Sequence, residues 1–274
     1  MTGLIDIGAN LTHDSFDHDR AEVLARAAAA GVTRLIITGA TASASLEALE
    51  LARSIPGRLY ATAGVHPHHA LDFGPQTIPR LAELAACAEV VAIGECGLDY
   101  FRDFSPRPAQ RDAFERQLEL AASSGKPVFL HQRDAHDDFL AMLREHRAAL
   151  AGGVAHCFTG SRGQMEAYLE LGLYIGITGW ICDDLRGASL REAVPALPLD
   201  RVMVETDAPY LLPRQLAKAS RNRRNEPANL PLVVDTLAMY MDVAAAELAV
   251  AATRNTEALF RLPPGTEPGL SARG

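Results

Sequence analysis

The chain has few lysines, few aromatic residues and no long hydrophobic run, and each shortage excludes a class of protein. Its 274 residues carry 26 basic and 34 acidic side chains, so the formal charge is −8, and only Lys126 and Lys218 are lysines. A domain that holds nucleic acid by bulk basicity is usually strongly positive, so that class is excluded. Unbroken apolar runs reach only five residues, as at 84–88. A transmembrane helix needs about 20, so we expect no membrane association.

Cysteine is also scarce, and its spacing is uninformative for metal or disulfide chemistry. The four cysteines lie at positions 87, 96, 157 and 182 and form no C-x-x-C pair. Neither a disulfide framework nor a zinc knuckle is therefore expected. The N-terminus lacks the basic start of a signal peptide, so we expect a cytoplasmic protein. We also expect a monomer. Hydrophobic residues make up 48% of the chain, which supplies a substantial core and argues against disorder.

Short apolar, β-rich segments recur along the chain, and longer stretches of helical periodicity separate them. The predicted strands are residues 4–9, 34–38, 59–63, 90–95, 127–131, 153–158, 174–178 and 202–207. Between them, residues 43–53 and 109–122 show apolar positions at helical spacing. Eight alternating strand and helix units predict an α/β fold, a single (β/α)₈ TIM barrel whose active site lies at the C-terminal rim of the strands.

An open doubly wound sheet is the rival fold. No G-x-G-x-x-G sequence follows the first predicted strand, so the usual sign of a dinucleotide-binding sheet is missing. No low-complexity linker divides the chain either. We predict one barrel domain over residues 1–262 and a loose terminus rich in proline and glycine over residues 263–274.

Acids and imidazoles directly follow several predicted strands. The main candidates for a site are Glu95, His131, His156 and Asp207, with His66 after the third strand and Asp6 and Asn10 on the first as secondary candidates. A single such residue is often a helix cap or a hydrogen-bonded rim residue. Four strands that each end in a ligand-type residue are hard to explain in that way. Converging carboxylates are costly to bury unless a cation compensates them. We therefore predict a divalent metal site, and the ligand types alone leave Mg²⁺, Mn²⁺ and Zn²⁺ open.

Six motifs in order resemble those of the TatD family of metal-dependent nucleases, within the amidohydrolase-type barrels. The stretches are 64–68 (GVHPH), 94–99 (GECGLD), 131–135 (HQRDA), 156–160 (HCFTG), 205–210 (ETDAPY) and 224–227 (RNEP). Most relatives carry His-x-His on the first strand. Here residues 6–10 read DIGAN, which is similar to the bacterial TatD proteins and removes two imidazoles.

This resemblance implies a function and a set of roles. Glu95, His131 and His156 would be metal ligands, and Asp207 would touch the metal or its water. The cofactor would be Mg²⁺, with Mn²⁺ or Zn²⁺ as alternatives, at one or two ions per chain. The activity would be that of a deoxyribonuclease, a 3′–5′ exonuclease on single-stranded DNA and possibly on RNA.

The chemistry of a metal-activated water then assigns catalytic roles. Glu95 would act through the metal, Asp207 would accept the proton of the water, and His66 would hydrogen-bond the phosphate or the leaving oxygen. For substrate binding we expect His66, Arg133, Arg223, Arg224 and Asn225. The segment 208–225 contains no acid but four arginines and Lys218, in a loop position that often binds phosphate in barrels. Unpaired bases could stack on aromatic residues that follow strand ends, namely Tyr100, Phe101, Phe104, Trp180 and Tyr210.

Two other readings stay open. The first is a metal-dependent deacylase or amidohydrolase, for example one that acts on aminoacyl-tRNA. A metal pair bridged by a carbamylated lysine is not expected, because neither Lys126 nor Lys218 lies at the end of the fourth strand, where Glu95 stands. The second reading is a metal-binding scaffold without enzymatic activity.

Overall fold

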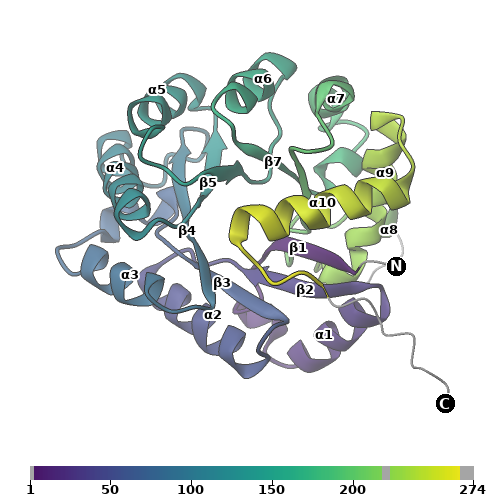
Figure 1. Ribbon diagram of the computed structural model, residues 1–274, viewed down its shortest axis with the longest axis horizontal. Coiled ribbons are helices and arrows are strands. Elements are labelled where there is room, and N and C mark those ends of the chain that lie inside the picture. The colour runs from purple at the N-terminus through teal and green to yellow at the C-terminus, as the bar shows by residue number, and fades with distance from the viewer. Residues whose placement is uncertain (1–2, 218–222, 266–274) are drawn as a thin grey trace.

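The computed structural model describes residues 3–217 and 223–265, and these form a barrel of eight parallel strands in chain order (Figure 1). The fold confirms the predicted (β/α)₈ architecture and excludes the open sheet. The strands are β1 (Leu4–Ala9), β2 (Val32–Ile37), β3 (Leu59–Ala63), β4 (Val90–Asp99), β5 (Val128–Arg133), β6 (Gly153–Ala155), β7 (Tyr174–Ile177) and β8 (Val202–Val204).

Helices surround the strands on the outside of the barrel (Figure 1). They are α1 (Arg20–Ala29), α2 (Ala42–Ser54), α3 (Thr77–Ala85), α4 (Arg107–Ser124), α5 (His136–His146), α6 (Arg162–Glu170), α7 (Ala188–Ala193), α8 (Arg214–Ala217), α9 (Leu230–Met241) and α10 (Ala245–Phe260). The short 3₁₀ helices are η1 (Asp14–Phe16), η2 (Pro67–Asp72), η3 (Gly179–Cys182), η4 (Val194–Ala196) and η5 (Pro227–Asn229). Helices α2 and α4 confirm the two predicted from periodicity.

The barrel interior is apolar at the end where the strands begin, and helix α10 closes that end. Interior side chains such as Ile5, Phe129 and Met203 pack in one cluster with Leu259 and Phe260 of α10. Because α10 covers the N-terminal ends of the strands, only the C-terminal rim remains open to a substrate. This is the rim on which barrel enzymes carry their active sites.

The seam between the first and last strands is closed by backbone hydrogen bonds and by the side chain of Asp6. Beside the isolated bridge of Ala9 and Ala208, the N–H of Asn10 donates to the carbonyl of Ala208 at 2.7 Å, and the N–H of Asp207 donates to the carbonyl of Gly8 at 2.8 Å. Asp6 Oδ1 accepts hydrogen bonds from the backbone N–H of Thr206 at 3.0 Å and of Gly8 at 3.2 Å, and Asp6 Oδ2 accepts from the Thr206 hydroxyl at 2.5 Å. Asp6 thus joins β1 to the residues that follow β8, and its contact with a metal stays a prediction. Burial raises the pKa of Asp6 to about 7.

Strand β4 continues four residues beyond its predicted end at Glu95. After a register shift, its residues 96–99 pair with residues 130–133 of β5. At Gly97 the backbone φ is +143°, and any side chain there would collide with the carbonyl oxygen of His131. The predicted strand ends between the two glycines of this segment, Gly94 and Gly97. In the fold they instead allow two strands to approach closely beside Glu95 and His131.

The other strand ends differ from prediction by a few residues, and the predicted tail is in part ordered. Strands β6 and β8 stop three residues before the predicted 158 and 207. The carbonyl of Pro263 accepts a hydrogen bond from Arg34 at 2.8 Å, and the N–H of Gly265 donates to Glu257 at 2.8 Å. The rest of the predicted tail lies outside the described residues. Within residues 3–217 and 223–265, no helix is both long and apolar enough to cross a membrane.

Candidate metal centre

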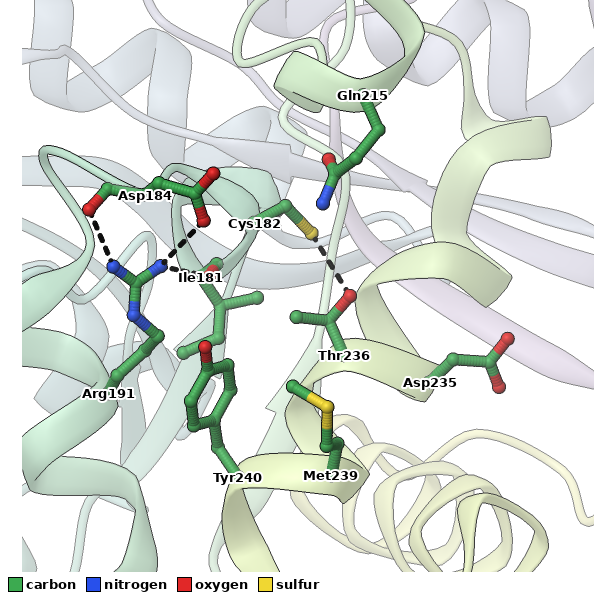
Figure 2. Close-up of a pocket in the computed structure, with 9 residues that line it drawn as sticks. All are labelled: Ile181, Cys182, Asp184, Arg191, Gln215, Asp235, Thr236, Met239 and Tyr240. Carbon is green, nitrogen blue, oxygen red and sulfur yellow. Dashed lines mark hydrogen bonds and ion pairs between the residues drawn. The ribbon is translucent and has the colours of Figure 1, made fainter.

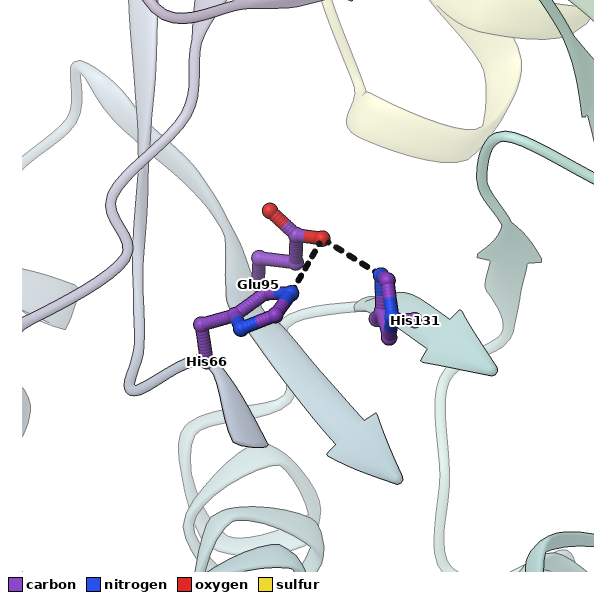
Figure 3. A group of neighbouring side chains, drawn as sticks. All are labelled: His66, Glu95 and His131. Carbon is purple, nitrogen blue, oxygen red and sulfur yellow. Dashed lines mark hydrogen bonds and ion pairs between the residues drawn. The ribbon is translucent and has the colours of Figure 1, made fainter. Parts of the chain in front are cut away.

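One carboxylate oxygen lies at the meeting point of three imidazoles on the C-terminal rim. Glu95 Oε1 of β4 is 2.9 Å from His131 Nδ1 of β5 and 2.7 Å from His156 Nε2, which follows β6. It is 3.3 Å from His66 Nε2, which follows β3. Figure 3 shows His66 and His131 pointing toward Glu95 from opposite sides. The structure therefore brings together four of the residues that the sequence selected.

The donor set fits a divalent cation. Ligand atoms of His66, Glu95 and His131 all lie within 4.8 Å of one another. His156 is not part of that group, but its Nε2 is the imidazole nitrogen nearest to Glu95 Oε1. One carboxylate and several imidazoles suit Mn²⁺ or Zn²⁺, and carboxylate also suits Mg²⁺. The arrangement supports a metal site and does not distinguish these ions.

Two further carboxylates stand behind the imidazoles, and the sequence analysis did not assign them a role. Glu205 Oε2 is 3.1 Å from His156 Nδ1, and Asp99 Oδ2 is 3.4 Å from His131 Nε2. His156 and His131 therefore each have one nitrogen toward Glu95 and the other toward a buried carboxylate. Such outer carboxylates commonly fix the tautomer and orientation of metal-binding histidines. A usable signal was present, because both acids belong to the quoted motifs.

Glu205 is fully buried, and its carboxylate fills a space beside two glycines. Its Oε1 accepts a hydrogen bond of 2.5 Å from the backbone N–H of Cys157. A side chain at Gly8 or Gly176 would overlap this carboxylate, so both glycines leave space for it. Two hydrogen-bonded contacts, with Cys157 and His156, thus compensate for the burial of the Glu205 carboxylate. An unpaired carboxylate in this place would be strongly destabilising.

Asp207 follows β8, and Asn10 holds it in place. The amide of Asn10 donates a hydrogen bond of 3.1 Å to Asp207 Oδ1, so Asn10 contacts the acid rather than the Glu95 group. Burial raises the pKa of Asp207 to about 7, although the nearby His156 imidazole lowers it in part. The negative charges of Glu95 and Glu205 also raise it. A carboxyl with this pKa can exchange a proton near neutral pH.

The pKa values of Glu95 and of the imidazoles around it depend on one another. Burial alone would raise the pKa of Glu95, but the imidazoles of His156 and His66 hold it well below its usual range. Burial alone would lower the pKa of His156, but the carboxylates of Glu95 and Glu205 raise it well above its usual range. Burial lowers the pKa of His66 to about 4, so this imidazole is neutral at neutral pH. A cation bound here would compete with the proton on His156.

Of the predicted phosphate-binding residues in the loop after β8, two are occupied by structural contacts. Both Arg224 Nη1 and Nη2 lie 2.7 Å from the carboxylate of Asp19, and Nη2 also bonds Glu226. Asn225 is buried, and its amide donates to the carbonyl of Thr206 at 3.0 Å. Both side chains therefore have partners within the protein, which a substrate would have to displace. Their expected contact with a substrate stays a prediction.

Of the other basic residues in this loop, Arg214 lies 3.3 Å from the carboxylate of Asp183. Arg223 is exposed, while Lys218 and Arg221 lie outside the described residues. Arg133 ends β5 and is half-buried. Lys126 lies at the opposite end of the barrel, where its amino group donates to the carbonyl of Val90 at the start of β4. That position agrees with the prediction that it cannot bridge two metals.

A surface cavity of about 350 Å³ lies elsewhere, between η3 and helix α9 (Figure 2). Its nine lining residues include Cys182, Arg191, Thr236 and Tyr240 and none of the predicted site residues. Arg191 there donates to backbone carbonyls of the neighbouring loop, at residues 181, 183 and 184. Without convergent reactive groups, this cavity is a poor candidate for the catalytic centre.

Known proteins with similar sequences and structures share this arrangement of strands. Residues 5–261 match the sequence profile of the family described as TatD related DNase. A relative from Pantoea sp. (strain At-9b), named 3'-5' ssDNA/RNA exonuclease TatD, is 51% identical over 94% of this chain and 100% of its own length. YJJV, a TatD homologue from Escherichia coli k12, has a crystal structure with a TM-score of 0.88 and 32% identity, covering 95% of this chain and 98% of its own. A TatD family hydrolase from Entamoeba histolytica has a TM-score of 0.83 and 27% identity, covering 94% and 98%. The chain therefore belongs to the family of TatD-related DNases.

Proposed function

We propose that this protein is a metal-dependent 3′–5′ exonuclease that acts on single-stranded DNA or RNA. The observation that carries the proposal is the convergence of three imidazoles on Glu95 Oε1 at the open rim, with Asp207 close by. The names of relatives at about 50% identity over nearly the full chain supply the substrate class and the polarity. The protein would work as a monomer with Mg²⁺ as its usual ion.

The group that faces the second ring nitrogen of each imidazole separates the proposed metal ligands from the proposed hydrogen-bond donor. His156 Nδ1 and His131 Nε2 face carboxylates, so a proton on each leaves the other nitrogen free to bind a cation beside Glu95. His66 differs, because its Nδ1 accepts a hydrogen bond from the backbone N–H of His68 at 3.1 Å. A neutral His66 must then carry its proton on Nε2. We therefore assign Glu95, His131 and His156 as ligands and His66 as a hydrogen-bond donor.

The chain's own residues then perform the proton transfers. A divalent cation in this place would polarise a phosphodiester oxygen and lower the pKa of a water molecule. Asp207, which accepts a hydrogen bond from Asn10, would accept the proton of the attacking water. His66 Nε2 donates to the scissile phosphate or to the departing 3′ oxygen. Arg133, two residues beyond His131 on the same strand, faces the same side and is placed to bind a phosphate.

Cleavage of four labelled substrates tests the proposal. Single-stranded DNA, duplex DNA, RNA and aminoacyl-tRNA are each incubated with Mg²⁺, Mn²⁺ or Zn²⁺, and the products are separated on a gel. We expect single strands to shorten progressively from the 3′ end with Mg²⁺ or Mn²⁺. Release of the amino acid with an intact tRNA would replace the nuclease by the deacylase. Absence of any cleavage with every metal would leave the scaffold reading in its place.

A further inference from the structure

Arg133, at the end of β5, contacts the rings of two aromatic residues beside the candidate metal centre. The guanidinium carbon of Arg133 lies 4.2 Å from the ring centre of Phe101, which follows β4, and 5.6 Å from that of Trp180 in η3. Strand register pairs Asp99 with Arg133 and Gly97 with His131, so Phe101 comes from the strand next to His131. These contacts therefore lie on the rim, one strand position beyond a proposed ligand.

Among the described residues, no carboxylate forms an ion pair with Arg133. No carboxylate of the described residues lies within 4.0 Å of its guanidinium nitrogens. Other rim arginines differ, because Arg186 pairs with Asp183 at 2.7 Å and Arg224 pairs with Asp19. A guanidinium that stacks on rings keeps its in-plane N–H groups free for an external anion. In a nuclease, a phosphate of the substrate would be the anion that binds to this guanidinium.

Two phenylalanines of the loop after β4 are exposed, and the ring of one of them, Phe101, contacts Arg133. Phe101 is 54% exposed and Phe104 is 64% exposed, which is unusual for large apolar rings. Phe104 packs at 4.8 Å against the His68 ring, and His68 packs at 4.2 Å against His66. Ring contacts therefore run without a gap from the exposed loop to the proposed donor His66. An aromatic surface that leads to the reacting phosphate is suited to flat, apolar groups.

We propose that Phe101 and Phe104 form a stacking surface for an unpaired base of the substrate, while Arg133, held by Phe101 and Trp180, binds a phosphate beside that base. This inference rests on the proposed function and adds to it the cause of single-strand preference. Bases in a duplex are already stacked and paired, so their faces cannot reach this loop without melting. An unpaired end presents a base face and a phosphate together, which matches rings beside the Arg133 guanidinium.

Equilibrium binding separates base stacking from phosphate contact. Fluorescence anisotropy is measured in EDTA, so that no cleavage occurs, with a labelled oligothymidylate and with an abasic-spacer oligomer of the same length. Phe101→Ala with Phe104→Ala should weaken binding of oligothymidylate about tenfold, and binding of the abasic oligomer much less, because Arg133 keeps its contact with Trp180. Arg133→Ala should weaken binding of both oligomers and reduce the salt slope by about 0.7. Val250→Ala, a 51% exposed residue of α10 at the opposite end of the barrel, is the control for the phenylalanines, and Arg80→Ala on α3 is the control for the arginine.

The outcomes separate this inference from the proposed function. Equal losses for both oligomers in the phenylalanine variant, or no loss for either, would overturn the stacking surface, even in an active nuclease. An unchanged salt slope in Arg133→Ala would overturn the phosphate contact. Wild-type protein that binds oligothymidylate through these rings but cleaves nothing with any metal would retain the surface and remove the exonuclease. The phenylalanines are exposed, so thermal unfolding should show that their variant remains folded.

Discussion

Glu205 decides which nitrogen of His156 faces Glu95, although it lies behind the imidazole and away from the substrate. Its carboxylate accepts from His156 Nδ1, which leaves Nε2 free to bind a cation. Glu205→Gln keeps the shape that fits the space beside the two glycines but presents an amide N–H₂ to one of the two donors. Positioning by carboxylates of this kind typically contributes 10–100-fold in metal affinity.

We therefore expect Glu205→Gln to bind Mn²⁺ about 10–100-fold more weakly than wild type. The free ion can be counted by electron paramagnetic resonance during a titration. Glu166→Gln, in an exposed ion pair with Arg162 on α6, is the control and should bind as wild type does. If Glu205→Gln retains full affinity while folded, Glu205 is only a packing residue.

Asp207 provides the second prediction at this scale. Asp207→Asn cannot accept a proton but retains the size of the side chain, so single-turnover cleavage of single-stranded DNA should fall by about 100-fold or more. Mn²⁺ affinity should change little, because Glu95, His131 and His156 remain. Asp242→Asn is a matched control, since both aspartates have φ of 55° and Asp242 is exposed. Near-wild-type cleavage by Asp207→Asn would remove Asp207 as the base.

At the level of elements, Asp19 and Arg224 join the loop after β8 to the start of α1. The Arg224 guanidinium, and then Arg26, hold the pKa of Asp19 down to about 2, against the burial that would raise it. A depressed acid pKa stabilises the fold above the unfolded pKa of 3.8, and this stability is lost as the pH falls from about 4 toward 2. The Asp19 side chain is 33% exposed, so solvent screening reduces the effect to about 1 kcal/mol.

Asp19→Asn should therefore lower the free energy of unfolding by about 1 kcal/mol at pH 7, and the deficit should shrink below pH 4. Denaturant unfolding at several pH values measures it. Asp14→Asn, whose carboxylate is 89% exposed, should show no comparable pH-dependent deficit. A deficit of constant size from pH 7 to pH 3 would mean that packing, and not charge, makes the contact.

At the level of the whole molecule, the candidate metal centre joins four strand ends, so a cation bound there should stabilise the fold. A ligand at 100 times its dissociation constant stabilises the native state by about 2.7 kcal/mol, which is about 5 °C in Tm for a chain of this size. Differential scanning fluorimetry with Mn²⁺ should show this gain at pH 8. The gain should decline toward pH 6, because protons compete for His156, whose pKa is raised.

Glu95→Gln should abolish the Mn²⁺-dependent gain in Tm, because it removes the oxygen on which the imidazoles converge. Glu115→Gln, whose carboxylate pairs with His146 on the helical side, should keep it. An equal Mn²⁺-dependent gain in wild type and Glu95→Gln would place the bound ion elsewhere in the protein.

Features that depend on neighbouring residues in the chain could be predicted from the sequence, and contacts between distant residues could not. Eight strands and the acids and imidazoles that follow them could be predicted, because strand periodicity and position along the chain are local properties. The end of β4 was misplaced, because its glycines mark a close approach to β5, which is a contact between distant residues. Arg224 and Asn225 belong to a basic loop in the sequence. Their partners are Asp19, directly before α1, and Thr206, which follows β8.

The sequence by itself determined the fold class, the side of the barrel that carries the site, and the residue types gathered there. Periodic apolar segments must alternate with helices, and the residues that follow parallel strands must meet at one rim. Only the tertiary structure decided which carboxylate faces which imidazole nitrogen, and which arginine keeps its charge available. Those properties depend on distances of about 3 Å between side chains of different strands, and hydrogen bonds and ion pairs weaken steeply beyond such distances.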